Sequence, residues 1–265
     1  MNILVFDIGN TQIKRGYYEG DVLAKSWRMT TGSSRTTDEY GINMRQLLNL
    51  ENIAIDKIDA VAISSVVPNL MHSFTGAVKR YLGMEPLVIG PGVKTGVNVR
   101  TPNPNEVGAD LITDVAAATE YYGYPCIIVD FGTATKYEVV NEKGEFIAAV
   151  FSPGIGISAE ALAEKAAQLP HFEIRKPKTI LTNTTIECMQ AGIVYGYIGQ
   201  VQYIVSEIKR EMNLPDMKVI ATGGFGRILA ENVNCFDHYD PTLTLKGVKL
   251  IAERYYSKKK RNAKA

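Results

Sequence analysis

Cysteine, histidine and tryptophan are scarce in this sequence of 265 residues, which has three, three and one of them. The cysteines, Cys126, Cys188 and Cys235, form no Cys-x-x-Cys pair, and their odd number argues against a disulfide framework. The histidines are far apart and lack the spacing of zinc ligands. The sequence therefore favours neither a disulfide-stapled protein nor a zinc protein.

The sequence also lacks an excess of charge of one sign and a long apolar run. Its 29 Lys and Arg residues balance 28 Asp and Glu residues, which gives no reason to expect a nucleic-acid or acidic-lipid partner. The acid at position 7 ends the first apolar run too early for a signal peptide, and no run of about 20 apolar residues predicts a membrane span. We therefore expect a cytoplasmic protein that binds neither nucleic acid nor membrane.

What the sequence does contain is a pattern that occurs twice. A buried strand at 2–8 ends in Asp7-Ile8-Gly9, and another, starting at Cys126, ends in Asp130-Phe131-Gly132. Two strand-like stretches joined by a hairpin signal follow each of them. The two turns lie nearly half the chain apart, which indicates an internal duplication. We expect two α/β domains, each beginning with three antiparallel strands, that face each other across a cleft.

The hydrophobic periodicity predicts the remaining elements. In the first half we expect strands at 2–8, 12–19, 22–29, 61–67 and 86–89 and helices at 37–49, 68–81 and 110–122. In the second half we expect strands from residue 126 and at 134–140, 145–150 and 218–221, and helices at 157–168, 185–212, 225–232 and 244–256. The stretch 91–107 is rich in Gly, Pro and Asn and predicts a loop.

The first Asp-x-Gly turn has the chemistry of a phosphate-binding loop. Gly9 lets the backbone approach a ligand closely, and Asn10 and Thr11 offer short donors beside the backbone N–H groups. Asp7, at the end of a central strand, can hold Mg²⁺ directly or through water. Lys14 or Arg15 on the next strand adds charge. The alternative is a plain hairpin turn capped by Asp and Asn.

The second turn, Asp130-Phe131-Gly132-Thr133-Ala134-Thr135, repeats this arrangement of an acid, a glycine and hydroxyls. The two loops together predict a site that holds a nucleotide polyphosphate from both sides. Thr222-Gly223-Gly224, at a strand–helix junction, is a third loop at which the backbone can approach adenosine. A simple helix-entry turn explains this third loop equally well.

Asp110 lies in Gly108-Ala109-Asp110, immediately before a helix with apolar periodicity. An N-cap aspartate is one explanation. The other is a general base that takes a proton from a substrate hydroxyl, because phosphoryl transfer depends on positioning and charge stabilisation with one such base. Both roles can hold together.

These motifs resemble those of the type III pantothenate kinases, members of the acetate kinase/sugar kinase/Hsp70/actin superfamily. The resemblance covers nearly the whole chain. It is carried by Asp7-x-Gly9-Asn10-Thr11-x-x-x-x-Gly16, Ile63-Ser64-Ser65-Val66-Val67-Pro68, Gly92-Val93-Lys94-Thr95-Gly96, Asn103-Pro104-x-Glu106-Val107-Gly108-Ala109-Asp110, Asp130-Phe131-Gly132-Thr133-Ala134-Thr135, Pro153-Gly154-Ile155, Ser158-Ala159-Glu160-Ala161-Leu162 and Asn183-Thr184-Thr185-Ile186-Glu187-x-Met189-Gln190-x-Gly192.

The resemblance implies a fold and a reaction. The fold is α/β, with two duplicated ribonuclease H-like (actin-like ATPase) domains, 1–118 and 119–265, flanking a nucleotide cleft. The reaction is ATP-dependent phosphorylation of the primary hydroxyl of pantothenate to 4'-phosphopantothenate, the first step of coenzyme A synthesis. It implies ATP, Mg²⁺ and K⁺ or NH₄⁺ as cofactors, and a homodimer whose site is completed across the dimer interface.

The resemblance also assigns roles to residues. Asp110 is implied as the proton acceptor, and Asp130 as the ligand of the monovalent cation. ATP is implied to contact Asp7, Ile8, Gly9, Asn10, Thr11, Gln12, Ile13, Lys14 and Thr133. Pantothenate is implied to contact Gly108, Ala109, Asp110, Leu111 and Thr185.

The sequence departs from the family pattern at two positions on the pantothenate side. Leu111 stands where the family usually has Arg, and Thr101 where it usually has an aromatic residue. Lys136 stands where the family more often has Thr or another small polar residue, and is a further source of charge. These departures keep two alternatives open: a kinase of another small hydroxyl compound, and a non-catalytic nucleotide-binding or regulatory homologue.

Overall fold

The computed structural model describes residues 1–32 and 35–262 and divides into two compact units. The first unit comprises Met1–Val97, Asn103–Ala117 and the chain from Leu243 onward. The second comprises Asn98–Pro102 and Ala118–Thr242. The units are thus not the two contiguous segments 1–118 and 119–265, because a short strand and the last helix each join the unit built mainly from the other part of the sequence.

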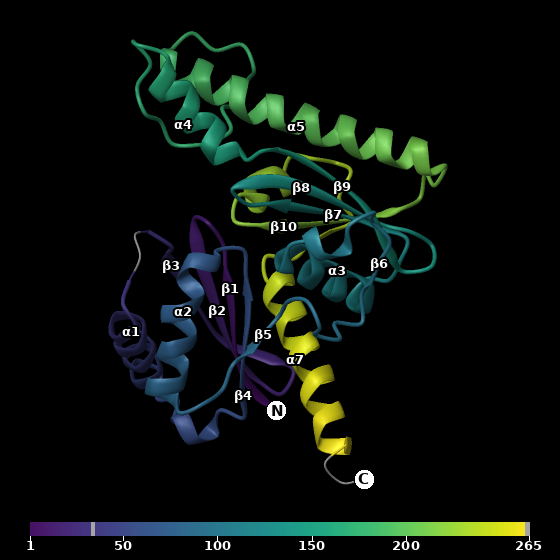
Figure 1. Ribbon diagram of the computed structural model, residues 1–265. Helices are drawn as coiled ribbons and strands as arrows, with labels where there is room; N and C mark the ends of the chain where they lie inside the picture. Colours follow the sequence, from purple (N-terminus) through teal and green to yellow (C-terminus); the bar gives the residue numbers. More distant parts are fainter. Residues whose placement is uncertain (33–34, 263–265) are drawn as a thin grey trace. The chain divides into compact units, whose positions relative to one another are not determined.

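The first unit is a five-stranded sheet with helices (Figure 1). The strand order is β3-β2-β1-β4-β5, with β1 antiparallel to β2 and parallel to β4. Its strands are β1 (Asn2–Ile8), β2 (Gln12–Glu19), β3 (Val22–Thr30), β4 (Ala60–Ser65) and β5 (Leu87–Val88). Its helices are α1 (Thr37–Leu50), α2 (Pro68–Ala77), α3 (Ala109–Tyr121), which runs on into the second unit, and α7 (Leu243–Asn262).

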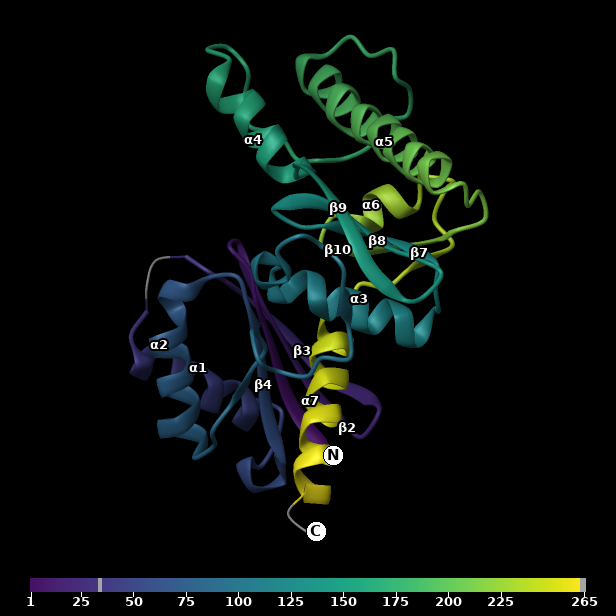
Figure 2. The same ribbon diagram turned by 45° about the vertical axis from the view of Figure 1, so that its right-hand side comes forward.

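The second unit has a six-stranded sheet in the order β11-β10-β7-β8-β9-β6. Its strands are β6 (Asn98–Val99), β7 (Cys126–Phe131), β8 (Ala134–Val140), β9 (Glu145–Pro153), β10 (Lys218–Gly223) and β11 (His238–Tyr239). Its helices are α4 (Ile155–Lys165), α5 (Thr185–Met212) and α6 (Gly226–Ala230). Figure 2 shows the long helix α5 beside the sheet of this unit.

The two units share one topology, as the repeated sequence pattern predicts. In each sheet the first strand of the repeat is central, antiparallel to the second and parallel to the fourth. Strands β1, β2, β3, β4 and β5 thus correspond to β7, β8, β9, β10 and β11. This mixed α/β architecture, repeated once, is the predicted fold class.

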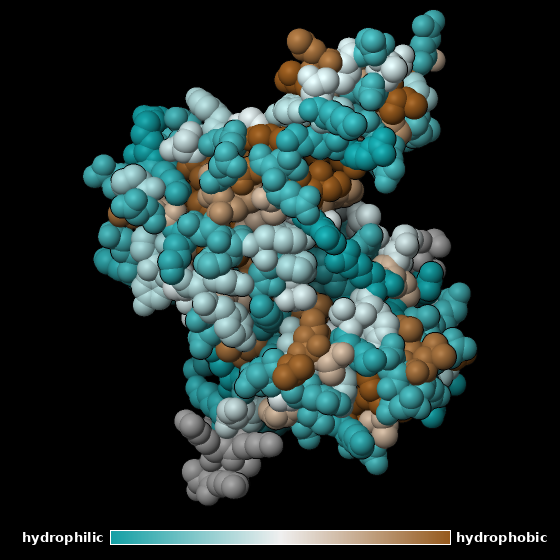
Figure 3. Space-filling model, turned by 180° about the vertical axis from the view of Figure 1, so that it is seen from behind, coloured by the Kyte–Doolittle hydropathy of each residue, from teal (hydrophilic) through white to brown (hydrophobic). Residues whose placement is uncertain are grey.

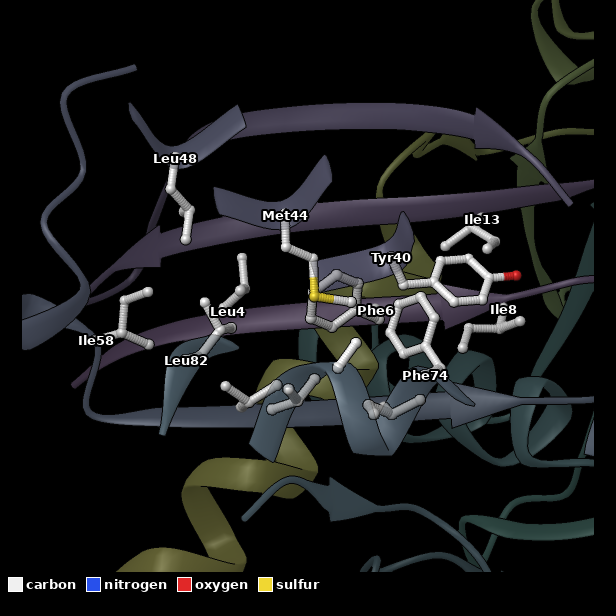
Figure 4. Packing of buried hydrophobic residues seen from close by; sticks show 14 of the residues in the cluster. Leu4, Phe6, Ile8, Ile13, Tyr40, Met44, Leu48, Ile58, Phe74 and Leu82 are labelled. Carbon is white, nitrogen blue, oxygen red and sulfur yellow. The ribbon is translucent and has the colours of Figure 1, made fainter. Parts of the chain in front are cut away.

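Alternation along the strands decides which side chains face which helices. Leu4, Phe6 and Ile8 on β1 point into a core formed with α1 and α2, where Phe74 packs edge-on against Phe6 and Tyr40 (Figure 4). Ile3 and Val5 point to the other face, which α7 covers. Because both faces are covered, β1 is apolar at nearly every position, which is why its sequence predicts a buried strand.

The second unit is built in the same way. Ile127, Val129 and Phe131 of β7 face a core that α5 covers with Tyr197 and Val201, among others. Its helix α5 spans 28 residues, with a side-chain cap from Thr184 to the backbone N–H of Glu187. Within 1–32 and 35–262, no helix has the length and apolar content needed to cross a bilayer.

The structure adds elements that the sequence pattern does not predict. The strands β6 and β11 are two residues long and, unlike the equally short β5, do not lie in an apolar run that would mark them. The predicted loop at 91–107 contains β6 and a single 3-10 turn (Pro104–Glu106). The predicted helix at 68–81 ends its α-helical part at Ala77 and continues as one π-helical turn to Leu82.

Candidate functional site

In the first unit, Asp7, Lys14 and Ser64 lie side by side on one face of the sheet. Asp7 is paired in register with Lys14 on β2 and with Ser64 on β4. The Lys14 Nζ lies 3.5 Å from Asp7 Oδ2, and the hydroxyl oxygen of Ser64 is buried without a hydrogen-bond partner in the described chain. The acid at the end of β1 therefore has a cation on one neighbouring strand and a hydroxyl on the other.

The turn after Asp7 is closed by its own backbone and braced by Thr31. The N–H of Gly9 donates to the carbonyl oxygen of Gln12 (3.1 Å). The Thr31 hydroxyl donates to the carbonyl oxygen of Gly9 (2.6 Å), and the Thr31 backbone N–H donates to the carbonyl oxygen of Thr11 (3.0 Å). Thr31 is buried, lies 20 residues beyond Thr11, and has no sequence signal that marks it as part of this loop.

The side chains of the loop divide into exposed and buried ones. Asn10, Thr11 and Gln12 are exposed, whereas Ile8 and Ile13 are fully buried in the core. The two isoleucines can therefore offer a ligand only backbone groups, and the polar residues between them can offer side chains as well. Gly9 does not have a positive φ, so its role is to leave space rather than to allow a left-handed turn.

The structure decides between Lys14 and Arg15 as the charge that accompanies this loop. Arg15 points to the opposite face of the sheet, where it is 2% exposed and donates to Asn43 Oδ1 at 2.6 Å. Burial lowers the pKa of Arg15 to about 10. Lys14, which faces Asp7, is thus the charge beside the loop, and Arg15 belongs to the core beneath α1.

Asp110 lies in the first turn of α3, partly exposed. Its Oδ1 accepts a hydrogen bond from the Leu111 N–H (2.9 Å). A Cβ at Gly108 would lie 2.5 Å from that oxygen and 3.6 Å from Val66, which comes directly after β4. Gly108 therefore leaves the space that the Asp110 carboxylate occupies, near the carboxyl end of β4, the strand next to the one that carries Asp7.

The second unit repeats the acid, lysine and hydroxyl more tightly. Asp130 is paired in register with Lys136 on β8 and with Thr222 on β10. The Lys136 Nζ lies 2.7 Å from Asp130 Oδ2, and the two side chains are only 12% and 8% exposed. The Thr222 hydroxyl oxygen is buried with no hydrogen-bond partner among residues 1–32 and 35–262.

The turn after Asp130 is braced by Gly154, the N-cap residue of α4. Its N–H donates to the carbonyl oxygen of the exposed Thr133 (3.0 Å). A Cβ at Gly154 would lie 2.2 Å from that oxygen and 2.5 Å from the carbonyl oxygen of Gly132, so only glycine fits. The end of β10 also approaches this turn closely, because a Cβ at Gly223, the last residue of the strand, would lie 2.6 Å from Asp130 Oδ1.

The residues expected to contact pantothenate fall in both units. Gly108, Ala109, Asp110 and Leu111 belong to the first unit, and Thr185 is the exposed first residue of α5 in the second. Leu111 is 7% exposed and apolar, so only its backbone is available as a donor or acceptor. The carboxylates at Asp7, Asp110 and Asp130 belong to no group of three or more His, Cys, Asp or Glu side chains able to hold a metal ion in the described part of the chain.

Solved structures share this architecture. The chain aligns over its whole length with the activator of 2-hydroxyisocaproyl-CoA dehydratase from Clostridium difficile, covering 97% of it with a TM-score of 0.55 and 14% identity. The likeness shows the actin-like ATPase fold and nothing more specific, because the identity is low.

Sequence relatives are much closer. The family model for type III pantothenate kinase matches residues 3–207. The chain is 48% identical to the type III pantothenate kinase of Agathobacter rectalis, over 94% of this chain and 96% of the relative. It is 44% identical to that of Moorella thermoacetica, over 95% and 99% respectively. The chain therefore belongs to the type III pantothenate kinase family.

Proposed function

We propose that this chain transfers the terminal phosphoryl group of ATP to the primary hydroxyl of pantothenate, the first step of coenzyme A synthesis. The observation that carries the proposal is the identity of 44–48% with two curated type III pantothenate kinases over nearly the full length of each. The presence of Asp7, Asp110 and Asp130 at strand ends and a helix start supports it. Since ATP is a cytoplasmic metabolite, we also propose a cytoplasmic location.

Asp110 is proposed as the base that accepts the proton of the pantothenate hydroxyl. Its Oδ1 is oriented by the Leu111 N–H, and Gly108 leaves room for the carboxylate. A positioned carboxylate can take the proton as the phosphoryl group arrives, and little other covalent help is needed. Gly108, Ala109, Leu111 and Thr185 are proposed to contact pantothenate, Leu111 through its backbone.

The loop from Asp7 to Lys14 is proposed to bind the phosphates of ATP. Its exposed Asn10, Thr11 and Gln12 offer side-chain groups, and Lys14 offers a positive charge. Gly9 and the buried Ile8 and Ile13 contribute backbone only. Thr133, exposed on the second turn, is proposed to contact ATP through its hydroxyl or backbone.

The divalent metal fits the residues present, with Asp7 as its protein ligand. Mg²⁺ is commonly held by one or two carboxylates together with waters and substrate phosphates, so a single Asp at a strand end is sufficient. When bound, Mg²⁺ neutralises charge on the phosphates. Asp7 would then orient the ion, and Lys14 beside it would share the phosphate charge.

The monovalent cation, K⁺ or NH₄⁺, does not fit in the same way. The resemblance implies Asp130 as its ligand, but the Lys136 ammonium already lies 2.7 Å from Asp130 Oδ2. This ammonium would repel a second positive ion beside the same carboxylate, and more strongly than at Asp7, where the Lys14 ammonium is 3.5 Å away and more exposed to solvent. We therefore derive no step through a free monovalent cation.

A homodimer is proposed on the exposed face of α5. Gly192, Gly196 and Gly199 are exposed along this helix, and a Cβ at any of them would meet nothing within 4 Å. A glycine in a helix interior costs roughly 1 kcal/mol relative to alanine, a cost that close approach of a partner helix would offset. Apolar side chains lie exposed in the same unit, among them Leu181 (85%) and Tyr203 (67%).

A groove next to these glycines gives the partner a surface to fill. It measures about 530 Å³ and is lined by Ile180, Leu181, Thr182, Cys188, Ala191, Gly192, Tyr195 and Gly196. Figure 3 shows hydrophobic side chains exposed among hydrophilic ones on one face of the molecule. Gly196→Leu should give a monomer by analytical ultracentrifugation, whereas the control Asn49→Leu on the exposed face of α1 should leave the dimer intact. A dimer in both variants would contradict this interface.

The proposed activity is tested by measuring ADP release from ATP and Mg²⁺ with and without pantothenate. Release that depends on pantothenate is expected. Release with another small hydroxyl compound but not with pantothenate would favour a related kinase. If the folded protein binds ATP but releases no ADP with any such compound, the chain is a non-catalytic homologue.

A further inference from the structure

Lys136 occupies an unusual place for a lysine. It lies on β8, directly across from Asp130 at the end of β7, and its side chain is only 12% exposed. The ammonium of lysine is strongly hydrated, and holding it in a buried position requires a partner of opposite charge. Asp130, with its side chain 8% exposed and its Oδ2 2.7 Å away, is that partner.

The Lys136 ammonium gives Asp130 the same kind of positive partner that a bound NH₄⁺ or K⁺ would give. All three carry one positive charge, and an ammonium group is close to K⁺ in size. The 2.7 Å separation is that of a strong charge-assisted hydrogen bond. The lysine is also fixed to the chain, so it does not have to be bound from solution.

The charge matters because Asp130 stands at the base of the turn that carries Gly132 and Thr133. An uncompensated carboxylate there would repel the phosphates of a nucleotide that approaches the turn. A single positive charge on Asp130 removes this repulsion, whichever group supplies it.

We propose that the Lys136 ammonium is a built-in replacement for the monovalent cation, so that this enzyme works without K⁺ or NH₄⁺. The proposal rests on the kinase activity proposed above. It predicts that removal of Lys136 creates a cation requirement that the natural chain does not have.

The groups that would receive the ion are already in place. Thr222 is next to Asp130 in register and therefore on the same face, and its buried hydroxyl oxygen has no hydrogen-bond partner in the described chain. Lys136→Thr would add a second hydroxyl from the opposite side, since β7 lies between β8 and β10. A carboxylate flanked by two hydroxyls is an oxygen site that K⁺ can fill.

The test compares pantothenate-dependent ADP release in sodium, potassium and ammonium salts of equal ionic strength. The unaltered chain should turn over equally in all three. Lys136→Thr should lose about tenfold or more of kcat/KM in sodium, mainly through a higher KM for ATP, and should recover in potassium or ammonium. The matched control is Lys143→Thr, the same change at an exposed lysine of the same unit, which should behave as the unaltered chain.

A second measurement needs no activity. The melting temperature of Lys136→Thr should rise when potassium or ammonium replaces sodium, and that of the unaltered chain should not change. In the double variant Lys136→Thr, Asp130→Asn this rise should disappear, because the carboxylate that holds the ion is gone. This readout keeps the inference testable even if the variant loses turnover.

The outcomes separate this inference from the proposed function. No pantothenate-dependent ADP release in any salt would overturn the proposed function. Release by the unaltered chain that requires potassium or ammonium would overturn the inference alone. The inference would also be overturned if Lys136→Thr lost activity equally in all three salts with no gain in melting temperature, or if it remained fully active in sodium.

Discussion

The two Asp-x-Gly turns of the molecule have the same arrangement of side chains but differ in the distance and burial of their Lys–Asp pair. Each places an acid at the end of a central strand, with a lysine across from it and a hydroxyl beside it. In the first unit the lysine lies 3.5 Å from the acid and is 20% exposed, whereas in the second the values are 2.7 Å and 12%. Both repeats thus contain the Lys–Asp pair, and the pair in the second unit is shorter and more buried.

The residues that brace the two turns, Thr31 and Gly154, also share one hydrogen bond and differ in the rest of their contacts. Thr31 and Gly154 each come directly after the third strand of their repeat, and each donates its backbone N–H to the turn at 3.0 Å. Thr31 adds a hydroxyl bond to Gly9, while Gly154 leaves no room for a side chain. Helix α4 begins directly after Gly154, which brings the backbone close to the turn. The same backbone bond is thus compatible with a threonine in one repeat and requires a glycine in the other.

The largest expected effect comes from comparing two aspartates at corresponding helices. Asp110 lies at the start of α3, which follows the first repeat, and Asp240 lies just before α7, which follows the second. Asp110→Asn should lower kcat by about 10²- to 10⁴-fold, because the amide cannot accept a proton. The free energy of unfolding should stay close to that of the unaltered chain, because the Asn side-chain oxygen can still accept the hydrogen bond from the Leu111 N–H. Steady-state kinetics and urea unfolding measure the two quantities.

Asp240, just before α7, provides the contrast. It is buried and accepts hydrogen bonds from the Tyr122 hydroxyl (2.9 Å) and from the backbone and side chain of Thr242. Asp240→Asn should lower the free energy of unfolding by about 1–2 kcal/mol and leave kcat unchanged. Near-normal turnover in Asp110→Asn would reject Asp110 as the base.

The second prediction compares the two lysines. In sodium buffer, Lys136→Met should lower the free energy of unfolding by about 3 kcal/mol, because it leaves a buried carboxylate without its ion pair. Lys14→Met should cost only about 1 kcal/mol, since that pair is longer and more exposed. Urea unfolding of both variants gives the difference, and equal losses would show that the two pairs are equivalent despite their geometry.

The third prediction compares the two braces. Gly154→Ala should destabilise the protein by about 1–3 kcal/mol, because its Cβ would overlap the Thr133 carbonyl oxygen. Thr31→Ala should cost about 1 kcal/mol, since it removes one hydroxyl bond and keeps the backbone bond. Gly132→Ala is the control, with the nearest atom to its Cβ at an ordinary 3.5 Å. If Gly154→Ala were as harmless as Gly132→Ala, the second turn would not be as tightly held as the structure shows.

The smallest effect concerns alkaline pH in the second unit. Burial and the hydrogen bond to Asp240 raise the pKa of Tyr122 to about 12 from the ordinary 10.0. Its contribution to stability is complete below pH 10, where both folded and unfolded chains keep the proton, and is lost as pH rises towards 12. Tyr122→Phe should therefore flatten the fall in unfolding free energy across this range. An unchanged slope would exclude Tyr122 as its source.

The helices and long strands agreed closely with the sequence pattern. The predicted strands at 2–8 and 12–19 match β1 and β2, and the predicted helix at 185–212 matches α5. These segments have apolar periodicity long enough to be recognised, and Gly, Asn or capping residues at their ends. The edge strands β6 and β11 escaped prediction, because they are two residues long and lack an apolar run like the one at 86–89 that marks the equally short β5.

The candidate site was predicted less completely. The acids and loops came from local motifs, but the sequence left Lys14 and Arg15 as equal candidates for the charge. Only the register of β2 against β1 places Lys14 on the face of Asp7 and sends Arg15 into the core. Thr31 had no local signal at all, because its bonds to the turn reach across 20 residues or more.

The sequence by itself determined that the chain is a duplicated α/β protein of the type III pantothenate kinase family, with Asp7, Asp110 and Asp130 at the starts and ends of its elements. These features are local, since they depend on short apolar runs and on the residues that end them. The tertiary structure alone decided that Lys136 covers Asp130, that Thr31 and Gly154 brace the turns, and that α7 completes the first unit. These facts depend on strand register and on packing between distant segments, which no local pattern contains.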